Sequence, residues 1–267
     1  MNTRLAPYIL AMVQLALVPL ALASCRAPRT AASSRPFAAA VEGAHAADVW
    51  RAQSAIEVAL SVEFGGQRMI DGTLWLTPDA ARTRYEAADG SVIVFDGRTA
   101  WASPASAATP RARFHALTWA YFLALPYKLD DPGTVLEELG EGRMGDRQYP
   151  IAQLSFAPGV GDAPDDWYVL YRDPSTSRLE AAAYIVTYGQ DPSAVTAKDA
   201  HAIRYEDFED VEGVPVARHW TFHNWSRAEG PGEPLIGEAR LARVRFVDAP
   251  AGAFVAPEGA AEIPLPR

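Results

Sequence analysis

One segment constrains the fold of this chain more than any other. Over residues 56–64, five apolar side chains alternate strictly with polar or small ones: Ile56, Val58, Leu60, Val62 and Phe64. Successive side chains of a β-strand point to opposite faces, so this pattern places all five on one face, whereas a helix would scatter them. The pair Gly65-Gly66 follows and supplies the positive φ angles of a tight turn. The segment therefore predicts a half-buried strand that begins an antiparallel hairpin.

Short strand-like segments, separated by turn residues, continue along the chain. Four follow at residues 68–76, 81–86, 92–95 and 98–101, and seven more at residues 135–139, 149–156, 167–173, 179–188, 200–208, 214–225 and 236–247. Strands joined by short turns pair with their neighbours in antiparallel fashion. The pattern predicts a mainly β protein with a few helices (α+β), built on about 11–12 strands that form a barrel or a curled sheet.

Two segments depart from this rhythm and predict helices. Residues 39–53 are rich in alanine, and His45 within them is expected to be a partly exposed helix residue. Residues 114–125 carry Phe114, Leu117 and Tyr121 at helical spacing, with other large apolar side chains on the flanks. Because this helix is apolar on all sides, it is interpreted as a plug in the core or as a lid that contacts a ligand, and the two roles are compatible.

The first 25 residues predict export and lipidation. Arg4 precedes an apolar run over residues 5–22, and Leu22-Ala23-Ser24-Cys25 resembles the lipobox of bacterial lipoproteins. In such proteins the cysteine carries diacylglycerol and becomes the mature N-terminus. The alternatives are an uncleaved membrane anchor and an ordinary secretory signal with an idle cysteine. Arg26 rather than aspartate follows Cys25. By the sorting rule known for lipoproteins of enteric bacteria, this resembles an outer-membrane address, so the expected location is the bacterial outer membrane, lipid-anchored and facing the periplasm.

Composition divides the chain into four parts. Residues 1–24 form the predicted signal peptide, and residues 25–39 the lipidated cysteine and a flexible tether of mostly Ala, Ser, Pro and Arg. Residues 40–248 show no break in composition and no internal repeat, which predicts a single domain. Residues 249–267 are rich in proline and are expected to form a loose tail.

Several of these segments together are similar to a known fold. The matching residues are Asp71-Gly72-Thr-Leu-Trp75, Pro78, Arg84-Tyr85, Phe95-Asp96-Gly97, Trp101, Tyr205-Glu-Asp-Phe208 and Gly213-Val-Pro215. Their order and spacing over residues 40–248 resemble the LolA/LolB-like lipoprotein-carrier fold and a group of uncharacterised bacterial lipoproteins with that fold. The resemblance implies a strongly curved, half-open antiparallel β-barrel with helices covering its mouth.

A half-open barrel with an apolar concave face would leave a groove that suits acyl chains. Each CH₂ group buried there would contribute about 0.8 kcal/mol. The candidate ligand-binding residues are Leu60, Val62, Trp75, Tyr85, Trp101, Trp119, Phe122, Trp167, Tyr184 and Trp220. Ordinary core packing is the alternative for each of them.

The sequence lacks the motifs of common catalytic and metal sites. It has no Gly-x-Ser-x-Gly elbow, phosphate-binding loop or His-Glu-x-x-His, and its one cysteine is assigned to lipidation. His219 and His223 lie in a strand-like segment. Four residues along a strand span roughly 13 Å, too far for both rings to bind one zinc ion at about 2 Å. We therefore expect no enzyme activity, no catalytic residues, no metal and no cofactor.

Charge and composition limit the partners. A net charge of −9, from 24 Lys and Arg against 33 Asp and Glu, argues against nucleic acid. We expect a monomer attached to the membrane through its N-terminal lipid, with a hydrophobic ligand or a lipoprotein as partner. The favoured function is binding of an acyl chain or lipoprotein lipid, in carriage or outer-membrane assembly. A protein- or peptide-binding stress-sensor module on the same fold is the alternative, and an envelope hydrolase is less favoured.

Overall fold

The computed structural model describes residues 35–265. The predicted signal peptide, Cys25 and the first part of the predicted tether lie outside the described residues. Within the described part, no helix is both long and apolar enough to cross a membrane. All of the described residues belong to one compact unit.

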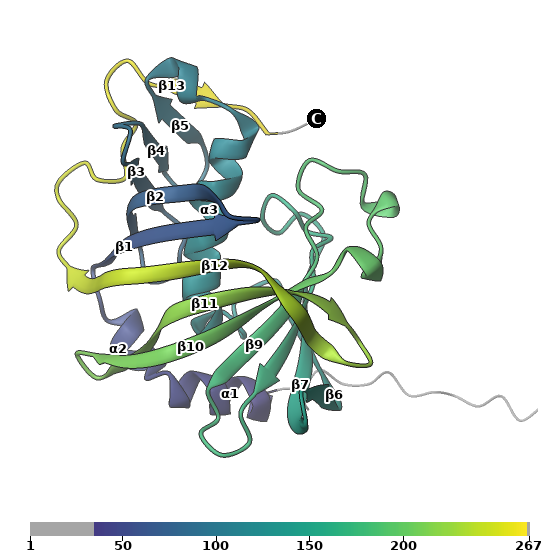
Figure 1. Ribbon diagram of the computed structural model, residues 1–267. Helices are drawn as coiled ribbons and strands as arrows, with labels where there is room; N and C mark the ends of the chain where they lie inside the picture. The colour runs from purple at the N-terminus through teal and green to yellow at the C-terminus, as the bar shows by residue number, and fades with distance from the viewer. Residues whose placement is uncertain (1–34, 266–267) are drawn as a thin grey trace, which may run out of the picture. The chain divides into compact units, whose positions relative to one another are not determined.

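Thirteen antiparallel strands and three α-helices make up the described chain (Figure 1). The helices are α1 (Arg35–Ala44), α2 (Ala47–Arg51) and α3 (Pro110–Ala124). The strands are β1 (Ala55–Phe64), β2 (Gln67–Leu76), β3 (Thr83–Ala87), β4 (Val92–Phe95), β5 (Ala100–Ser103), β6 (Thr134–Met144), β7 (Arg147–Phe156), β8 (Tyr168–Arg172), β9 (Leu179–Tyr184), β10 (His201–Val211), β11 (Val214–Ser226), β12 (Gly230–Val247) and β13 (Ala261–Ile263). The predicted mainly β, antiparallel class is confirmed.

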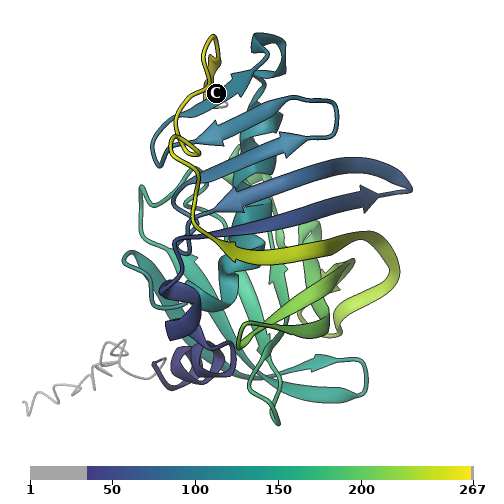
Figure 2. The same cartoon turned by 90° about the vertical axis from the view of Figure 1, so that its left-hand side faces the viewer.

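The strands join in one sheet in the order β13-β5-β4-β3-β2-β1-β12-β11-β10-β9-β8-β7-β6. Strands far apart in the sequence meet at its centre, where β1 pairs with β12. Strands β13 and β6 stand at the two ends of this order and do not pair with each other in the described chain, so the sheet stays open. Figure 2 shows α3 on one side of the curved sheet, running across its strands. The predicted half-open barrel with covering helices is confirmed.

Irregular pairing accounts for the bending of the sheet. Register shifts interrupt the pairing of β1 with β12 after Ala59, of β1 with β2 after Val62 and of β11 with β12 after Phe222. An extra residue on one strand bends that strand and increases its twist. At Gly237 of β12, a Cβ atom would lie 2.6 Å from the Glu63 carbonyl oxygen, so only glycine allows this close approach.

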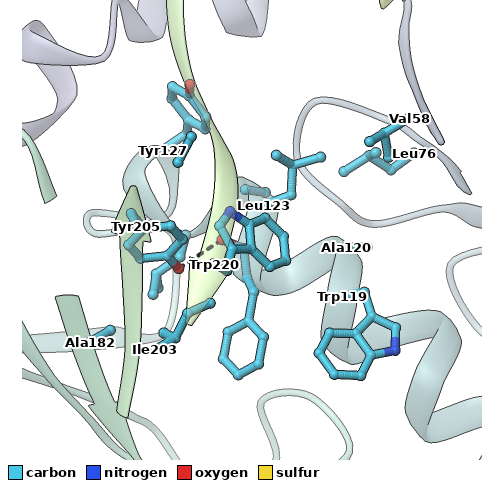
Figure 3. Packing of buried hydrophobic residues seen from close by; sticks show 14 of the residues in the cluster. Val58, Leu76, Trp119, Ala120, Leu123, Tyr127, Ala182, Ile203, Tyr205 and Trp220 are labelled. Carbon is cyan, nitrogen blue, oxygen red and sulfur yellow. Dashed lines mark hydrogen bonds between the residues drawn. The ribbon is translucent and has the colours of Figure 1, made fainter. Parts of the chain in front are cut away.

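The main apolar core lies between the sheet and the helices. The side chains labelled in Figure 3 come from both halves of the sheet and from α3 and the turn after it: Val58, Leu76, Trp119, Ala120, Leu123, Tyr127, Ala182, Ile203, Tyr205 and Trp220. The Tyr205 hydroxyl donates a hydrogen bond to the Phe122 carbonyl oxygen at 2.9 Å, which ties β10 to α3. One side of α3 is therefore fixed in the core, as expected of a plug.

A second apolar cluster covers the other face of the sheet around β8. Along this strand, Leu170 belongs to the main core, whereas its neighbours Val169 and Tyr171 belong to the second cluster. Since successive strand residues point to opposite faces, the two clusters lie on opposite faces. The indole Nε1 of Trp225 donates to the Tyr171 hydroxyl at 2.8 Å within this cluster. Both faces of this part of the sheet are therefore buried.

His45 was wrongly expected to be partly exposed, since only 2% of it is accessible. The predicted helix is broken at Ala46, which adopts the left-handed conformation with φ 52°. The His45 Nε2 atom accepts a hydrogen bond from the Leu179 N–H group at 3.0 Å. Burial lowers the pKa of His45 to about 4, so the ring is neutral at pH 7. Alanine rarely adopts a positive φ, so the sequence did not signal the break.

Both ends of the described chain are more ordered than the composition indicated. Helix α1 begins at Arg35, within the stretch interpreted as tether, and Phe37 and Val41 pack into the main core. In the predicted tail, Ala261–Ile263 forms β13 and pairs with β5, with Ile263 buried. In both places apolar side chains bind to partners far away in the sequence, which composition alone does not show.

Candidate functional site

A cavity of about 340 Å³ lies between α3, the adjoining ends of β7, β8 and β9, and the loops beside them. This volume falls within the range of roughly 300–1,000 Å³ that is usual for small-molecule sites. Five α3 residues form one wall: Phe114, Leu117, Thr118, Tyr121 and Phe122. Aromatic and aliphatic side chains from β7, β8, β9 and the residues after β9 form the opposite wall. The cavity is therefore mainly apolar, with a few polar groups among its lining residues.

The sequence around α3 fixes where this wall begins and ends. Pro110 occupies the first turn, and the Thr109 hydroxyl accepts a hydrogen bond from the Ala112 N–H group at 3.2 Å. After Ala124 the chain tightens into a short 3₁₀ turn, Leu125–Tyr127, that contains a proline. The residues at the two ends of α3 therefore determine where the helix begins and ends.

One side of helix α3 faces the cavity and the other side packs into the main core. Phe114, Leu117 and Tyr121 face the cavity, while Trp119 and Leu123 are buried in the core. At 3.6 residues per turn, these two sets lie on opposite sides of the helix. The helix is apolar all round because one side packs as a plug and the other side forms a cavity wall.

Aromatic contacts across the cavity link α3 to the sheet. The ring centroids of Tyr121 and Tyr168 are 5.4 Å apart, and those of Phe122 and Tyr184 are 5.0 Å apart. These separations are typical of favourable aromatic pairs. The contacts hold the two walls together at one end of the cavity and leave the remaining space open. Through Phe122, Tyr168 and Tyr184 the cavity also borders the main core.

A loop after β7, residues 157–167, forms a third wall and is tied to α3 by a buried ion pair. The Arg113 guanidinium donates to the two Asp162 carboxylate oxygens at 2.6 and 2.9 Å, and Arg113 is only 4% exposed. It also lies 5.0 Å above the ring of Phe95. Hydrogen bonding to Asp162 raises the pKa of Arg113, so the guanidinium stays charged. This pair holds the loop against the N-terminal half of α3.

Two polar groups at the cavity, the Asp166 carboxylate and the Tyr121 hydroxyl, could bond to a ligand. The Asp166 carboxylate accepts hydrogen bonds from the N–H group and hydroxyl of Thr187, each at 2.7 Å. Burial raises the pKa of Asp166. The Tyr121 hydroxyl is buried and has no hydrogen-bond partner among the described residues, and burial raises its pKa as well. A ligand could therefore find both apolar contacts and polar contacts here.

The structure brings part of the predicted ligand-binding set to this cavity. Phe122 and Tyr184 line it. Five others are buried in the main core: Leu60, Val62, Tyr85, Trp119 and Trp220. Ligand contact by any of these residues remains a prediction.

Three predicted tryptophans lie outside the main core. Trp75 alternates with the core residues Leu74 and Leu76, and its indole Nε1 donates to Glu57 Oε2 at 3.2 Å. Trp101 is likewise flanked on β5 by two core alanines. Trp167 packs against the second cluster. These residues were selected as large aromatics, but strand alternation turns Trp75 and Trp101 to the face opposite the main core.

Sequence reasoning did not select several residues that line the cavity. The helical spacing of Phe114, Leu117 and Tyr121 was the available signal, since it marks one side of α3. Asp166 had no such signal. Its hydrogen-bonding partner Thr187 is 21 residues away in the sequence, so only the fold brings the two together.

The two histidines of β11 bond to different partners, and the predicted strand is confirmed. The His219 Nε2 atom lies 3.1 Å from Glu238 Oε2, while the His223 Nδ1 atom lies 2.8 Å from the Gly232 carbonyl oxygen. Across residues 35–265, no group of three or more His, Cys, Asp or Glu side chains is placed to hold a metal ion.

The curved open sheet crossed by helix α3 is a LolA-like fold. The LolA superfamily protein NE2245 from Nitrosomonas europaea superposes with a TM-score of 0.56 at 12% identity, over 83% of this chain and 97% of that one. A DUF1329 family protein from Desulfovibrio piger superposes with a TM-score of 0.50 at 13% identity, over 82% and 97%. At such identities the likeness establishes the fold alone.

A third solved structure is more distant. It is a putative outer membrane lipoprotein-sorting protein domain from Vibrio parahaemolyticus, with a TM-score of 0.48 at 9% identity, over 81% of this chain and 93% of that one. No protein-family model and no curated protein matches the sequence. The function must therefore be argued from the cavity.

Proposed function

We propose that this protein is an envelope lipoprotein that binds an acyl chain, or the lipid of another lipoprotein, in the cavity beside α3. The observation that carries the proposal is the cavity itself, about 340 Å³ enclosed mainly by aromatic and aliphatic side chains. Each CH₂ group moved from water into such a space contributes about 0.8 kcal/mol. In this role the protein carries its ligand or hands it over, without catalysis.

Two further features support this role. The LolA-like fold is of the lipoprotein-carrier type and leaves its sheet open. The lipobox-like sequence ending at Cys25 would hold the protein at the outer membrane, facing the periplasm. A protein anchored in this way would work beside a membrane, where acyl chains and lipoproteins are its neighbours.

Filling the cavity tests this proposal directly. Leu117→Trp places a larger side chain into the cavity from α3, so it should weaken binding of an uncharged apolar dye such as N-phenylnaphthylamine by at least about tenfold. The measurement is an equilibrium fluorescence titration of the soluble domain. Thermal unfolding, recorded in parallel, should show that the variant remains folded, because the new ring enters empty space rather than packed core.

The matched control is Leu235→Trp, the same substitution on β12 at a side chain that is 46% exposed. Its dye binding should equal that of the wild type. Equal binding by Leu117→Trp and the wild type would place the dye elsewhere and defeat the proposal. A wild-type protein that binds no dye but copurifies with a stable protein partner would favour the peptide-binding alternative.

A further inference from the structure

Of the carboxylates that line the cavity, Asp131 and Asp162 are in ion pairs, whereas Asp79 and Asp166 make no ion pair in the described chain. The charge of Lys128 acts on Asp79 and helps to lower its pKa. No Lys, Arg or His side chain in the described chain lies within ion-pair distance of Asp166. The Asp166 carboxylate is thus left without a compensating positive charge.

The hydrogen bonds of Asp166 leave one of its oxygen atoms free for a ligand. Both bonds from Thr187, at 2.7 Å, go to Oδ1. Oδ2 accepts from no group in residues 35–265. Asp166 is half-buried and lines the cavity. A ligand in the cavity could therefore donate a hydrogen bond to Oδ2.

Tyr121 lines the same cavity as Asp166. The charge of Asp166, with that of Asp131, acts on Tyr121 and adds to the effect of burial in raising its pKa. The Tyr121 hydroxyl is buried and has no hydrogen-bond partner in the described residues. Leaving a buried polar group unpaired is unfavourable, so a ligand group that bonds to it would gain affinity.

We propose that Asp166 and Tyr121 select apolar ligands whose head group donates hydrogen bonds and carries no negative charge. Alkyl amines, amides and acylglycerols meet this requirement, whereas a fatty-acid carboxylate would face the uncompensated charge of Asp166. The proposal rests on the proposed function and narrows its ligand class. Chain burial provides the affinity, and the polar groups at the cavity provide the discrimination.

A competition experiment tests this selectivity. Dodecylamine, monolauroylglycerol and laurate carry chains of the same length, and each is added below its micelle concentration to the protein loaded with N-phenylnaphthylamine. In the wild type, laurate should displace the dye at least about tenfold less well than dodecylamine. Asp166→Asn should reduce this difference by about tenfold, because asparagine still accepts the Thr187 hydrogen bonds but removes the charge.

The matched control is Asp165→Asn, the same change at the exposed neighbouring residue, which does not line the cavity. It should keep the wild-type order of the three ligands. Because burial raises the pKa of Asp166, its charge opposes folding, and Asp166→Asn should unfold at the wild-type temperature or above it. This measurement shows that a change in selectivity is not a folding defect.

Failure of the inference and failure of the proposed function give different results. If the wild type binds the dye and laurate competes as well as dodecylamine, the inference is overturned while apolar binding stands. Selection by Asp166 is likewise overturned if Asp166→Asn and Asp165→Asn behave alike. If the dye does not bind at all, the proposed function fails and the inference falls with it.

Discussion

Replacement of Cys25 by serine is expected to move the protein from the membrane fraction to the soluble periplasmic fraction. The lipobox-like sequence Leu22-Ala23-Ser24-Cys25 supplies the small residues and the thiol that diacylglyceryl transfer requires. Two acyl chains on one residue give stable membrane binding, whereas a protein without them has no comparable anchor. The change should therefore be nearly complete. Cell fractionation and the intact mass of the purified protein measure it.

The control for this experiment is Ser24→Ala, which keeps a small residue before the cysteine. It should remain membrane-bound and should retain the mass of the lipid. A wild-type protein of unmodified mass, free in the periplasm, would show that Cys25 is idle. The uncleaved-anchor alternative would appear as a membrane-bound protein that keeps residues 1–24.

Loss of Arg113, the ion-pair partner of the cavity residue Asp162, is expected to have a large effect on stability. Arg113→Met leaves the Asp162 carboxylate without its ion-pair partner. Arg113 is only 4% exposed, and Asp162 is partly exposed. Removing one member of a buried ion pair costs about 3–5 kcal/mol in the free energy of unfolding, because the remaining charge is uncompensated. Since Asp162 retains some access to water, we expect a loss near 3 kcal/mol, measured by urea unfolding.

Arg68→Met provides the comparison for this variant. Arg68 makes ion pairs with Glu63 and Asp71, but its side chain is 56% exposed. Exposed pairs contribute little, so this variant should unfold at nearly the wild-type urea concentration. Equal effects of the two substitutions would mean that the Arg113 pair does not hold the loop to α3. If it does, Arg113→Met should also release a bound dye faster than the wild type.

The succession of strands along the chain could be predicted because local sequence patterns specify it. The alternation from Ile56 to Phe64 and the paired glycines after it fix β1, its buried face and the hairpin to β2. Turn residues separate the later strands in the same way. The pairing of β1 with β12 joins segments from opposite ends of the domain, and no local pattern carries that contact. This pairing was therefore not predicted and is known from the structure.

The candidate site was harder to predict than the fold. Aromatic residue type indicates burial but not which surface buries the ring, so the selection combined core residues such as Trp220 with the outward-facing Trp75. The useful signal was the second apolar side of α3, at Phe114, Leu117 and Tyr121. A helix that is apolar on two sides is expected to be shielded from water on both of them. The sequence pattern could not show that one of them is a cavity.

The most direct test of acyl-chain binding in the α3 cavity is photochemical cross-linking. A monoacylglycerol with a diazirine on its chain is bound to the soluble domain, activated by light, and located by mass spectrometry of the digested protein. Cross-links are predicted in the segments 114–122, 160–166 and 184–188, which contain residues that line the cavity, and excess unlabelled monoacylglycerol should suppress them. Cross-links confined to β6 or to the cluster around Trp225, or labelling that unlabelled lipid does not reduce, would contradict binding in this cavity.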